Sequence, residues 1–332
     1  MTAPLDVPES ARESAPAAEA AGMDRKAIQG RSLGQIAWMR LKRDKVAMAG
    51  LGVIVFLIVV AVFAPLVVKW FGHPPLEFHR DMIDQETQVP KDAWGGMSWE
   101  YLFGVDPLWG RDIFSRVVYG ARISLLVAFL STLLSVTIGT VLGITAGFFG
   151  GWVDTVISRA MDVFLAFPLL VFAIALAGVV PNDAFGLSGD GLRVTLLIFI
   201  IGFFSWPYIG RIVRGQTLSL REREFVDAAR SLGARRPYII FREILPNLVA
   251  PILIYSTLLI PSNILFEAAL SFLGVGVRPP TPTWGGMLSD AARIYTVPHY
   301  AIFPGLAIFL TVLAFNLFGD GLRDALDPRG NR

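Results

Sequence analysis

Long apolar stretches alternate with shorter polar segments along most of this 332-residue chain. A helix needs about 20 apolar residues to cross the hydrocarbon core of a membrane. Six stretches meet that length, at 47–68, 123–147, 161–180, 194–213, 248–273 and 300–319. The pattern therefore predicts an all-α membrane protein with six transmembrane helices.

Small and helix-breaking residues recur within these stretches. Proline lacks a backbone N–H and kinks a helix, but neighbouring membrane helices can satisfy the carbonyl that it frees. Such kinks suit a bundle that moves, although proline is also commoner in membrane helices in general. Glycines at every fourth position of the second stretch predict a close approach to another helix. The prolines are Pro168, Pro207, Pro251, Pro261 and Pro304, and the glycines are Gly139, Gly143 and Gly147.

Composition and charge support insertion in a membrane and predict its direction. Hydrophobic residues make up 54% of the chain and charged residues only 17%, and the mean hydropathy is +0.58. Basic loops stay on the cytoplasmic side of a membrane. With the N-terminus inside, the cytoplasmic segments carry 20 of the 29 lysines and arginines. Both termini are therefore predicted to be cytoplasmic, and no global charge pattern points to nucleic acid.

The polar segments divide the chain into a tail, a basic segment and a membrane domain. Residues 1–30 are rich in Ala, Pro, Glu and Ser and are predicted to be a disordered cytoplasmic tail. A basic cytoplasmic segment follows at 31–46. The membrane domain is expected at 47–327, with a long outer loop at 69–122 and a cytoplasmic loop at 211–247.

The loop 211–247 contains a short amphipathic helix. Apolar side chains at i, i+3, i+4 and i+7 share one helix face, and here they are Phe225, Ala228, Ala229 and Leu232. Gly233 suits the left-handed residue that ends a helix, and Pro237 can start the next one. A rigid helix with small alanines is a suitable docking surface for a soluble motor protein. The alternative is an interfacial helix that rests on anionic lipid through its arginines.

The spacing of this loop resembles a known transport motif. Asp227-Ala228-Ala229, Gly233 and Leu245-Pro246 are similar to the EAA loop of ABC importer permeases. This resemblance implies a coupling helix that sits in a groove of an ATP-binding subunit. Asp227 stands where Glu is usual, and Glu243 occupies the usual isoleucine position, with Ile244 one place later. The docking residues implied are Glu224, Phe225, Asp227, Ala228, Ala229, Leu232, Gly233, Leu245 and Pro246.

Further motifs resemble the C-type dipeptide, oligopeptide and nickel permeases of this family. They lie in the same order at 103–125, at 150–154, at 267–274 and at 279–285, and the resemblance covers roughly 32–327. It implies a type I ABC importer-like permease fold in the bacterial cytoplasmic membrane. It also implies two ATP-binding subunits, a second permease of the B type, an extracytoplasmic solute-binding protein and a peptide substrate. Nickel or another small solute is the alternative cargo.

The chain contains no Gly-x-x-x-x-Gly-Lys-Ser/Thr phosphate loop. ATP and Mg are therefore expected to be used by partner subunits, and no cofactor is expected on this chain. No catalytic set of side chains is recognisable. His73 and His79 are loosely spaced without a nearby cysteine, so no metal site is predicted. The chain is expected to be a passive translocation subunit that alternates between inward and outward access.

The runner-up function is an ion-coupled secondary transporter, which would need buried ionisable groups near the middle of the membrane. Only Glu267 lies suitably within a predicted helix. Glu267 and the nearby Asn263 are therefore candidate pathway or gate residues. The alternative is that Glu267 has a structural role, hydrogen-bonded near Asn263 or to a neighbouring helix.

Overall fold

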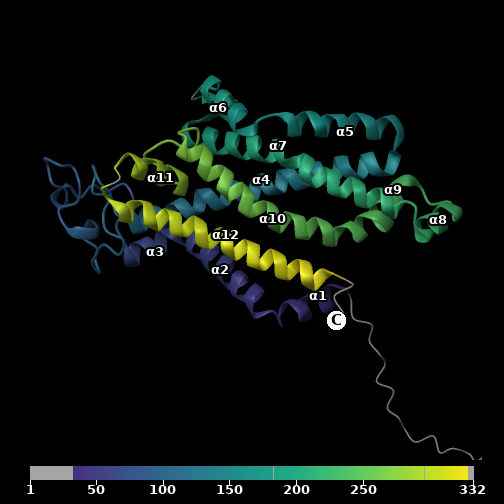
Figure 1. Cartoon of the computed structure of the whole chain (residues 1–332), viewed down its shortest axis with the longest axis horizontal. Coiled ribbons are helices and arrows are strands. Elements are labelled where there is room, and N and C mark those ends of the chain that lie inside the picture. The colour runs from purple at the N-terminus through teal and green to yellow at the C-terminus, as the bar shows by residue number, and fades with distance from the viewer. Residues whose placement is uncertain (1–32, 182, 295, 328–332) are drawn as a thin grey trace, which may run out of the picture.

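The described part of the chain forms a bundle of long helices (Figure 1). The loop-rich segment 72–112 lies at one end of the bundle and is called the cap. The computed structural model describes residues 33–181, 183–294 and 296–327. The expected tail 1–30 lies outside the described residues. The longer helices are α2 (Lys45–Val62), α4 (Ile113–Phe149), α5 (Gly151–Ala166), α7 (Gly189–Leu220), α10 (Leu245–Phe272) and α12 (Pro298–Leu326).

Shorter elements join or flank these helices. A two-stranded antiparallel hairpin, β1 (Asp183–Ala184) and β2 (Leu187–Ser188), precedes α7. A π-helical turn at Ile239–Ile244 connects α9 directly to α10. The other short elements are α1 (Leu33–Leu41), α3 (Ala64–Phe71), α6 (Leu169–Val179), α8 (Glu224–Ser231), α9 (Arg236–Tyr238), α11 (Trp284–Arg293) and the 3₁₀ turns Arg80–Met82 and Ala93–Gly95.

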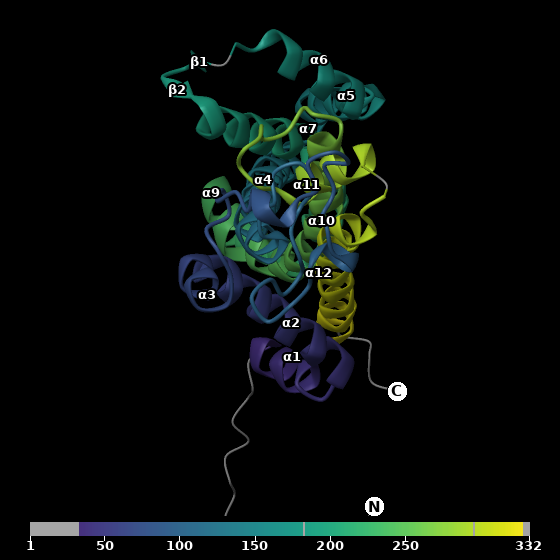
Figure 2. The ribbon, with the colours of Figure 1, turned by 90° about the vertical axis from the view of Figure 1, so that its left-hand side faces the viewer.

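Seen end-on, α4, α7, α10 and α12 lie between two flanking groups of helices (Figure 2). The pair α5–α6 lies on one side and the group α1–α3 on the other. By length and composition, five described helices could cross a membrane, and a sixth span results if the bent pair α5–α6 counts as one. The predicted helical membrane protein is thus confirmed, but one of the six spans is not a straight helix.

The predicted span 161–180 is wrong as a continuous helix. The chain breaks between α5 and α6, which meet at 77°. Pro168 lies at the N-terminal boundary of α6, and Phe167 before it has extended backbone angles. The residue before proline avoids the helical conformation because it would clash with the proline ring. Pro168 therefore ends a helix, whereas the other four prolines named above do lie inside helices.

Two predicted loops are shorter than expected. Helix α4 begins at Ile113, so the outer loop is reduced to the residues between α3 and α4. The carboxylate of Asp112 caps α4 by accepting hydrogen bonds from the N–H groups of Phe114 and Ser115. Arg116 and Arg122 interrupt the apolar pattern of this first part of α4, which concealed the helix. Similarly, α7 extends to Leu220 and shortens the loop predicted at 211–247.

A buried ion cluster holds the cap against the first turn of α4. Asp106 is fully buried and accepts a hydrogen bond from the Nε of Arg111 at 2.7 Å. The Nη2 of Arg111 lies 2.6 Å from the same carboxylate, and the Nε of Arg116 lies 3.8 Å from it. Buried charges are stable only when they are paired, so this cluster fixes how the cap sits on the bundle.

Helices α4 and α7 make the most extensive helix contact in the described chain. A Cβ atom placed on Gly139 or on Gly143 would lie 2.7 Å from a backbone oxygen of α7. The small residues predicted to pack closely therefore do so. Ion pairs attach α5 to α7, with Arg211 Nη2 2.6 Å from Asp162 and Arg214 bound through two nitrogens to Asp154.

Candidate docking surface

Helix α8 lies at the end of the bundle opposite the cap, between α7 and the α9–α10 segment (Figure 1). Its first turn carries Glu224 and Asp227 and its last turn carries Arg230, charges that suit the helix dipole. Val226 is fully buried and packs into a cluster that includes Ile239 and Ile244. Val226, with Ala229 packed partly against the same cluster, fixes α8 to the bundle, and most of the helix faces outward.

Gly233 ends α8 in a left-handed conformation, as predicted, with φ of +82°. The N–H of Gly233 donates to the carbonyl of Arg230 at 2.9 Å, and the N–H of Ala234 donates to the carbonyl of Ala229 at 3.0 Å. These two bonds form a Schellman motif, which satisfies carbonyls that the helix end would otherwise leave free. The turn thereby directs the chain back along α8 toward α9.

The returning chain forms the second wall of a groove. Pro237 lies in the first turn of α9, as predicted, because that position needs no N–H. The groove between α8 and this segment has a volume of about 620 Å³. It is lined by Phe225, Ala228, Ala229, Leu232, Gly233, Ala234, Arg235, Tyr238 and Glu243. The four apolar residues predicted to share one face of α8 therefore lie together on one groove.

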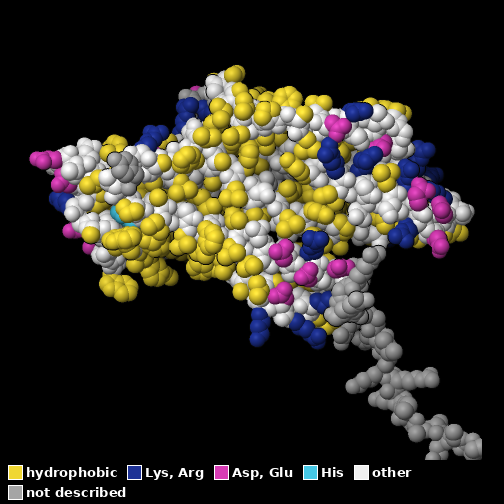
Figure 3. Space-filling view, in the orientation of Figure 1, with side chains coloured by type: hydrophobic (Ala, Val, Ile, Leu, Met, Phe, Trp, Pro, Cys, Tyr) yellow, Lys and Arg dark blue, Asp and Glu magenta, His cyan; other side chains and the backbone are white. Residues whose placement is uncertain are grey.

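The groove presents apolar surface to the exterior. Leu232 is 89% exposed, and Phe225 and Tyr238 are exposed as well. Glu243 and Arg235 supply one charge of each sign on the same lining. Exposed aromatic and aliphatic side chains within a charged rim are typical of a protein interaction site. Charged side chains of both signs surround this end of the molecule (Figure 3).

Four of the predicted docking residues lie off the groove. Glu224 is exposed, and Asp227 pairs with Arg230 at 3.0 Å on another face of α8. Leu245 packs against the cluster around Val226 and so supports the groove from beneath. Pro246, the fourth of these residues, lies off the groove as well. It lies in the first turn of α10, and the helix runs through it.

The π-helical turn before Pro246 accounts for this continuity. Proline lacks an N–H and crowds the preceding turn of an α-helix, and a wider π turn relieves that crowding. The turn also places Glu243 on the groove and Ile244 in the buried cluster. Sequence reasoning overlooked Ala234, Arg235, Tyr238 and Glu243 on this surface and Val226 in the buried cluster that anchors it. For Glu243, the available signal was a charged residue at a position where isoleucine is usual.

The candidate pathway residues lie inside the bundle, away from this groove. Glu267 is fully buried and accepts a hydrogen bond from Ser271 Oγ at 2.7 Å on the same helix. Asn263 Nδ2 donates to Thr132 Oγ1 of α4 at 2.8 Å. Glu267 and Asn263 therefore bond to different partners, one on the same helix and one on α4. The pathway or gate role of this pair stays a prediction.

We predict that Gly233→Val will weaken coupling while the bundle stays folded. A side chain with a branched Cβ in the left-handed region costs roughly 1 kcal/mol or more, and Gly233 is exposed and away from the core. ATP-dependent uptake into cells and thermal unfolding of the purified chain should be measured together. Gly233→Asn is the matched control, because asparagine tolerates this conformation. Loss of membrane insertion in the valine variant would contradict the prediction.

A second prediction separates a structural role of Asn263 from a pathway role. Asn263→Ala removes one hydrogen bond between α10 and α4, a bond that contributes about 0.6 kcal/mol in membrane bundles. We therefore expect a small loss of thermal stability and near-normal uptake. Unchanged stability with abolished uptake would instead assign Asn263 to the transport route.

Comparison with known proteins identifies the family. Residues 139–332 match the family described as binding-protein-dependent transport system inner membrane component. Residues 32–85 match the N-terminal TM domain of oligopeptide transport permease C. The chain is similar over 88% of its length to two relatives, each covered over 89%. They are a dipeptide transport system permease protein of Alkalihalophilus pseudofirmus (43% identical) and a glutathione transport system permease protein of Escherichia coli O6:K15:H31 (44% identical).

A solved structure shows the same fold. The match is an inward-facing form of the MetNI methionine ABC transporter, with a TM-score of 0.52 and 18% identity. It covers 65% of this chain and 98% of the solved one. The helical fold of this chain is thus that of a type I ABC importer permease. The chain belongs to the binding-protein-dependent transport system inner membrane components and is a C-type permease subunit of an ABC importer.

Proposed function

We propose that this chain is one of two different permease subunits of an ATP-driven importer of peptides. The observation that carries the proposal is the exposed groove beside α8, held to the bundle by Val226 and closed by the turn at Gly233. Two ATP-binding subunits would use ATP and Mg, and one of them would dock here. Its closure would push the α8–α9 segment and shift the long helices between inward and outward access.

The positive charges at the same end of the molecule support a direction of insertion in the membrane. The end with α8 carries many arginines, including Arg211, Arg221, Arg235 and Arg242, and basic segments stay cytoplasmic. We place α8 and both ends of the described chain, at residues 33 and 327, in the cytoplasm. The cap would then lie outside, where an extracytoplasmic binding protein could deliver the cargo.

A peptide is the favoured cargo because the two relatives are named for a dipeptide and for glutathione, which is itself a short peptide. Nickel or another small solute is the alternative. Within the described residues, no group of three or more His, Cys, Asp or Glu side chains has the geometry of a metal site. Competition between unlabelled peptides and labelled dipeptide during uptake would decide the cargo class.

Single cysteines can test the proposed docking, because the chain contains none of its own. Leu232→Cys places a thiol on the groove, and Phe185→Cys places one in the hairpin before α7; both positions are 89% exposed. Cross-linking in native membranes, followed by mass spectrometry, should capture an ATP-binding protein at position 232 and not at 185. Capture of lipid alone at position 232 would contradict the docking role.

The same variants test the orientation. A maleimide that does not cross membranes should label Phe185→Cys in intact cells and Leu232→Cys only after the membrane is opened. The reverse pattern would overturn the proposed insertion.

A further inference from the structure

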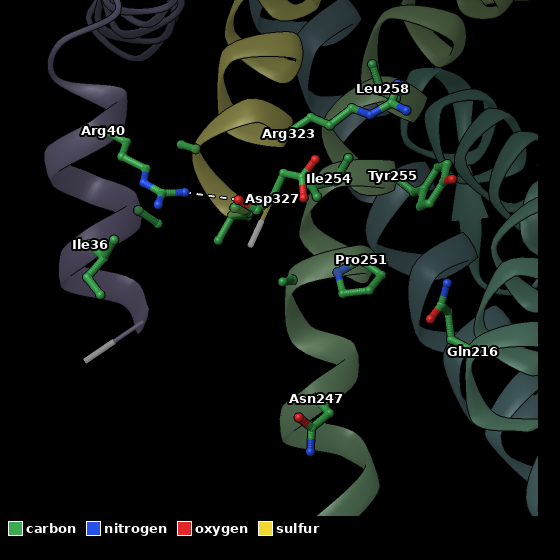
Figure 4. Close-up of a pocket in the computed structure, with 14 residues that line it drawn as sticks. Ile36, Arg40, Gln216, Asn247, Pro251, Ile254, Tyr255, Leu258, Arg323 and Asp327 are labelled. Atoms are coloured by element: carbon green, nitrogen blue, oxygen red, sulfur yellow. Dashed lines mark hydrogen bonds between the residues drawn. The ribbon is translucent and has the colours of Figure 1, made fainter. Parts of the chain in front are cut away.

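A second groove is lined by residues of α1, α7, α10 and the end of α12 (Figure 4). Helices α1 and α10 both pack against α12 and leave this space between them. Its volume is about 640 Å³, within the range of roughly 300–1,000 Å³ usual for small-molecule sites. Its apolar wall consists of Ile36, Ala37, Ala250, Pro251, Ile254, Leu258, Ala325 and Leu326.

Polar side chains gather along one edge of this wall. Arg323 reaches from α12 toward Leu258 and Tyr255 of α10 (Figure 4). Arg40 of α1 donates a hydrogen bond to the backbone carbonyl of Asp327 at 3.0 Å. With the carboxylate of Asp327, the lining has two positive charges and one negative charge. Tyr255, Asn247 and Gln216 add neutral hydrogen-bonding groups.

The charge of Arg323 is available to a ligand. Its side chain is exposed, and no ion pair with it occurs among the described residues. A guanidinium binds phosphate through paired N–H groups that match the phosphate oxygens. An apolar wall beside an open guanidinium is therefore complementary to an amphiphile with a phosphate head and a hydrocarbon chain.

Helix α1 indicates the depth of the groove in the membrane. Trp38 and Met39 are exposed on α1, and the ammonium group of Lys42 lies 5.1 Å from the ring centre of Trp38. A short helix with an exposed tryptophan next to lysine and arginine is typical of the layer between water and hydrocarbon. Because α1 forms one wall, the groove lies at the level of lipid headgroups.

We infer that this groove binds an anionic phospholipid of the cytoplasmic leaflet, with its phosphate at Arg323 and an acyl chain along the α10 wall. Basic pockets between membrane helices on that side recognise anionic headgroups. The choice of leaflet rests on the orientation given under the proposed function, whereas the choice of ligand class rests on the groove itself. The bound lipid would link α1 to α10. Helix α1 leads into the first membrane helix, α2, and α10 is a helix that a partner docked at α8 would move.

Native mass spectrometry of the full chain can measure this binding directly. The detergent-solubilised protein would be titrated with phosphatidylglycerol or with zwitterionic phosphatidylcholine. We expect tighter binding of phosphatidylglycerol, and a loss of about fivefold in its affinity in Arg323→Gln, since one basic residue near an anionic surface contributes about that factor. Arg323→Lys keeps the charge and should keep most of the preference.

Arg43→Gln is the matched control, because Arg43 is exposed at the same end of the chain and does not line the groove. An equal loss of affinity in Arg43→Gln would overturn the inference and assign the effect to general surface charge. Equal affinity for the two lipids in the unmodified chain would also overturn it.

Photo-cross-linking from position 254 in native membranes tests which molecule occupies the groove. An adduct with the mass of a phospholipid supports the inference. An adduct with a peptide or with a second protein chain would overturn it and assign the groove to the transport route or to a subunit interface. The maleimide labelling of position 232 reads orientation separately, so failure of the lipid site and failure of the proposed function give different results.

Discussion

Ala229→Glu is expected to abolish ATP-dependent uptake while the chain remains inserted and folded. Ala229 lines the groove beside α8, and a partner that covers it would bury the new carboxylate without a counter-charge. Leaving an unpaired charge in an interface costs about 3 kcal/mol or more, which corresponds to more than about a hundredfold loss of affinity. The measurements are uptake of labelled dipeptide and recovery of the ATP-binding subunit with the tagged chain.

A second variant, Ala228→Glu, separates loss of docking from loss of folding. Ala229 also packs partly against the cluster around Val226, so glutamate there could displace α8 itself. Ala228 is exposed, lines the same groove and does not belong to that cluster. Ala228→Glu should therefore reproduce the loss of docking with unchanged thermal stability.

Ser231→Glu is the matched control for the added charge. Ser231 is exposed on α8 and lies outside the groove lining. Normal uptake is expected in this variant. Equal losses in all three glutamate variants would show that charge on α8 is harmful in general, and normal uptake in Ala228→Glu and Ala229→Glu would remove the docking role from this face.

Gly143→Leu is expected to cause the largest loss of stability. A Cβ at Gly143 would lie 2.7 Å from the carbonyl oxygen of Gly210, a backbone atom that cannot rotate away. Helices α4 and α7 would have to separate along their whole contact. Overpacking a tight site costs typically 1–3 kcal/mol, and we expect a loss near the upper end, about 3 kcal/mol.

Gly52→Leu provides the control, because nothing lies within 4 Å of a Cβ placed on Gly52 of α2. Thermal unfolding and the yield of monodisperse protein in detergent should fall sharply in Gly143→Leu and little in Gly52→Leu. Similar stability of the two variants would mean that α4 and α7 are not held together at the glycines.

The membrane spans show which features of the fold the apolar pattern predicts and which it does not. Length and hydropathy alone locate the regions of α2, α4, α7, α10 and α12, because lipid requires a continuous apolar helix whatever its neighbours are. The pattern could not reveal the break at Pro168, because an apolar run has the same composition whether it is straight or bent. It also began α4 ten residues late, since Arg116 is buried by pairing with Asp106 across the cap.

At the docking surface, too, the sequence predicts the local features, and contacts between distant parts of the chain decide the rest. Local spacing places Phe225, Ala228, Ala229 and Leu232 on one face and requires a left-handed residue at Gly233, because helix periodicity and backbone sterics act over a few residues. Whether that face is open or buried depends on Val226, whose contacts with Ile239 and Ile244 come from a later part of the chain.

By itself, the sequence determined the class of the protein, its family motifs and the residues that share the α8 face. These follow from hydropathy, from helix periodicity and from short-range motifs. Only the tertiary structure decided that Tyr238 and Glu243 complete the groove, that Asn263 bonds to Thr132, and that Arg323 and α1 form a second groove. These contacts join residues on separate helices, and the packing of those helices sets their distances.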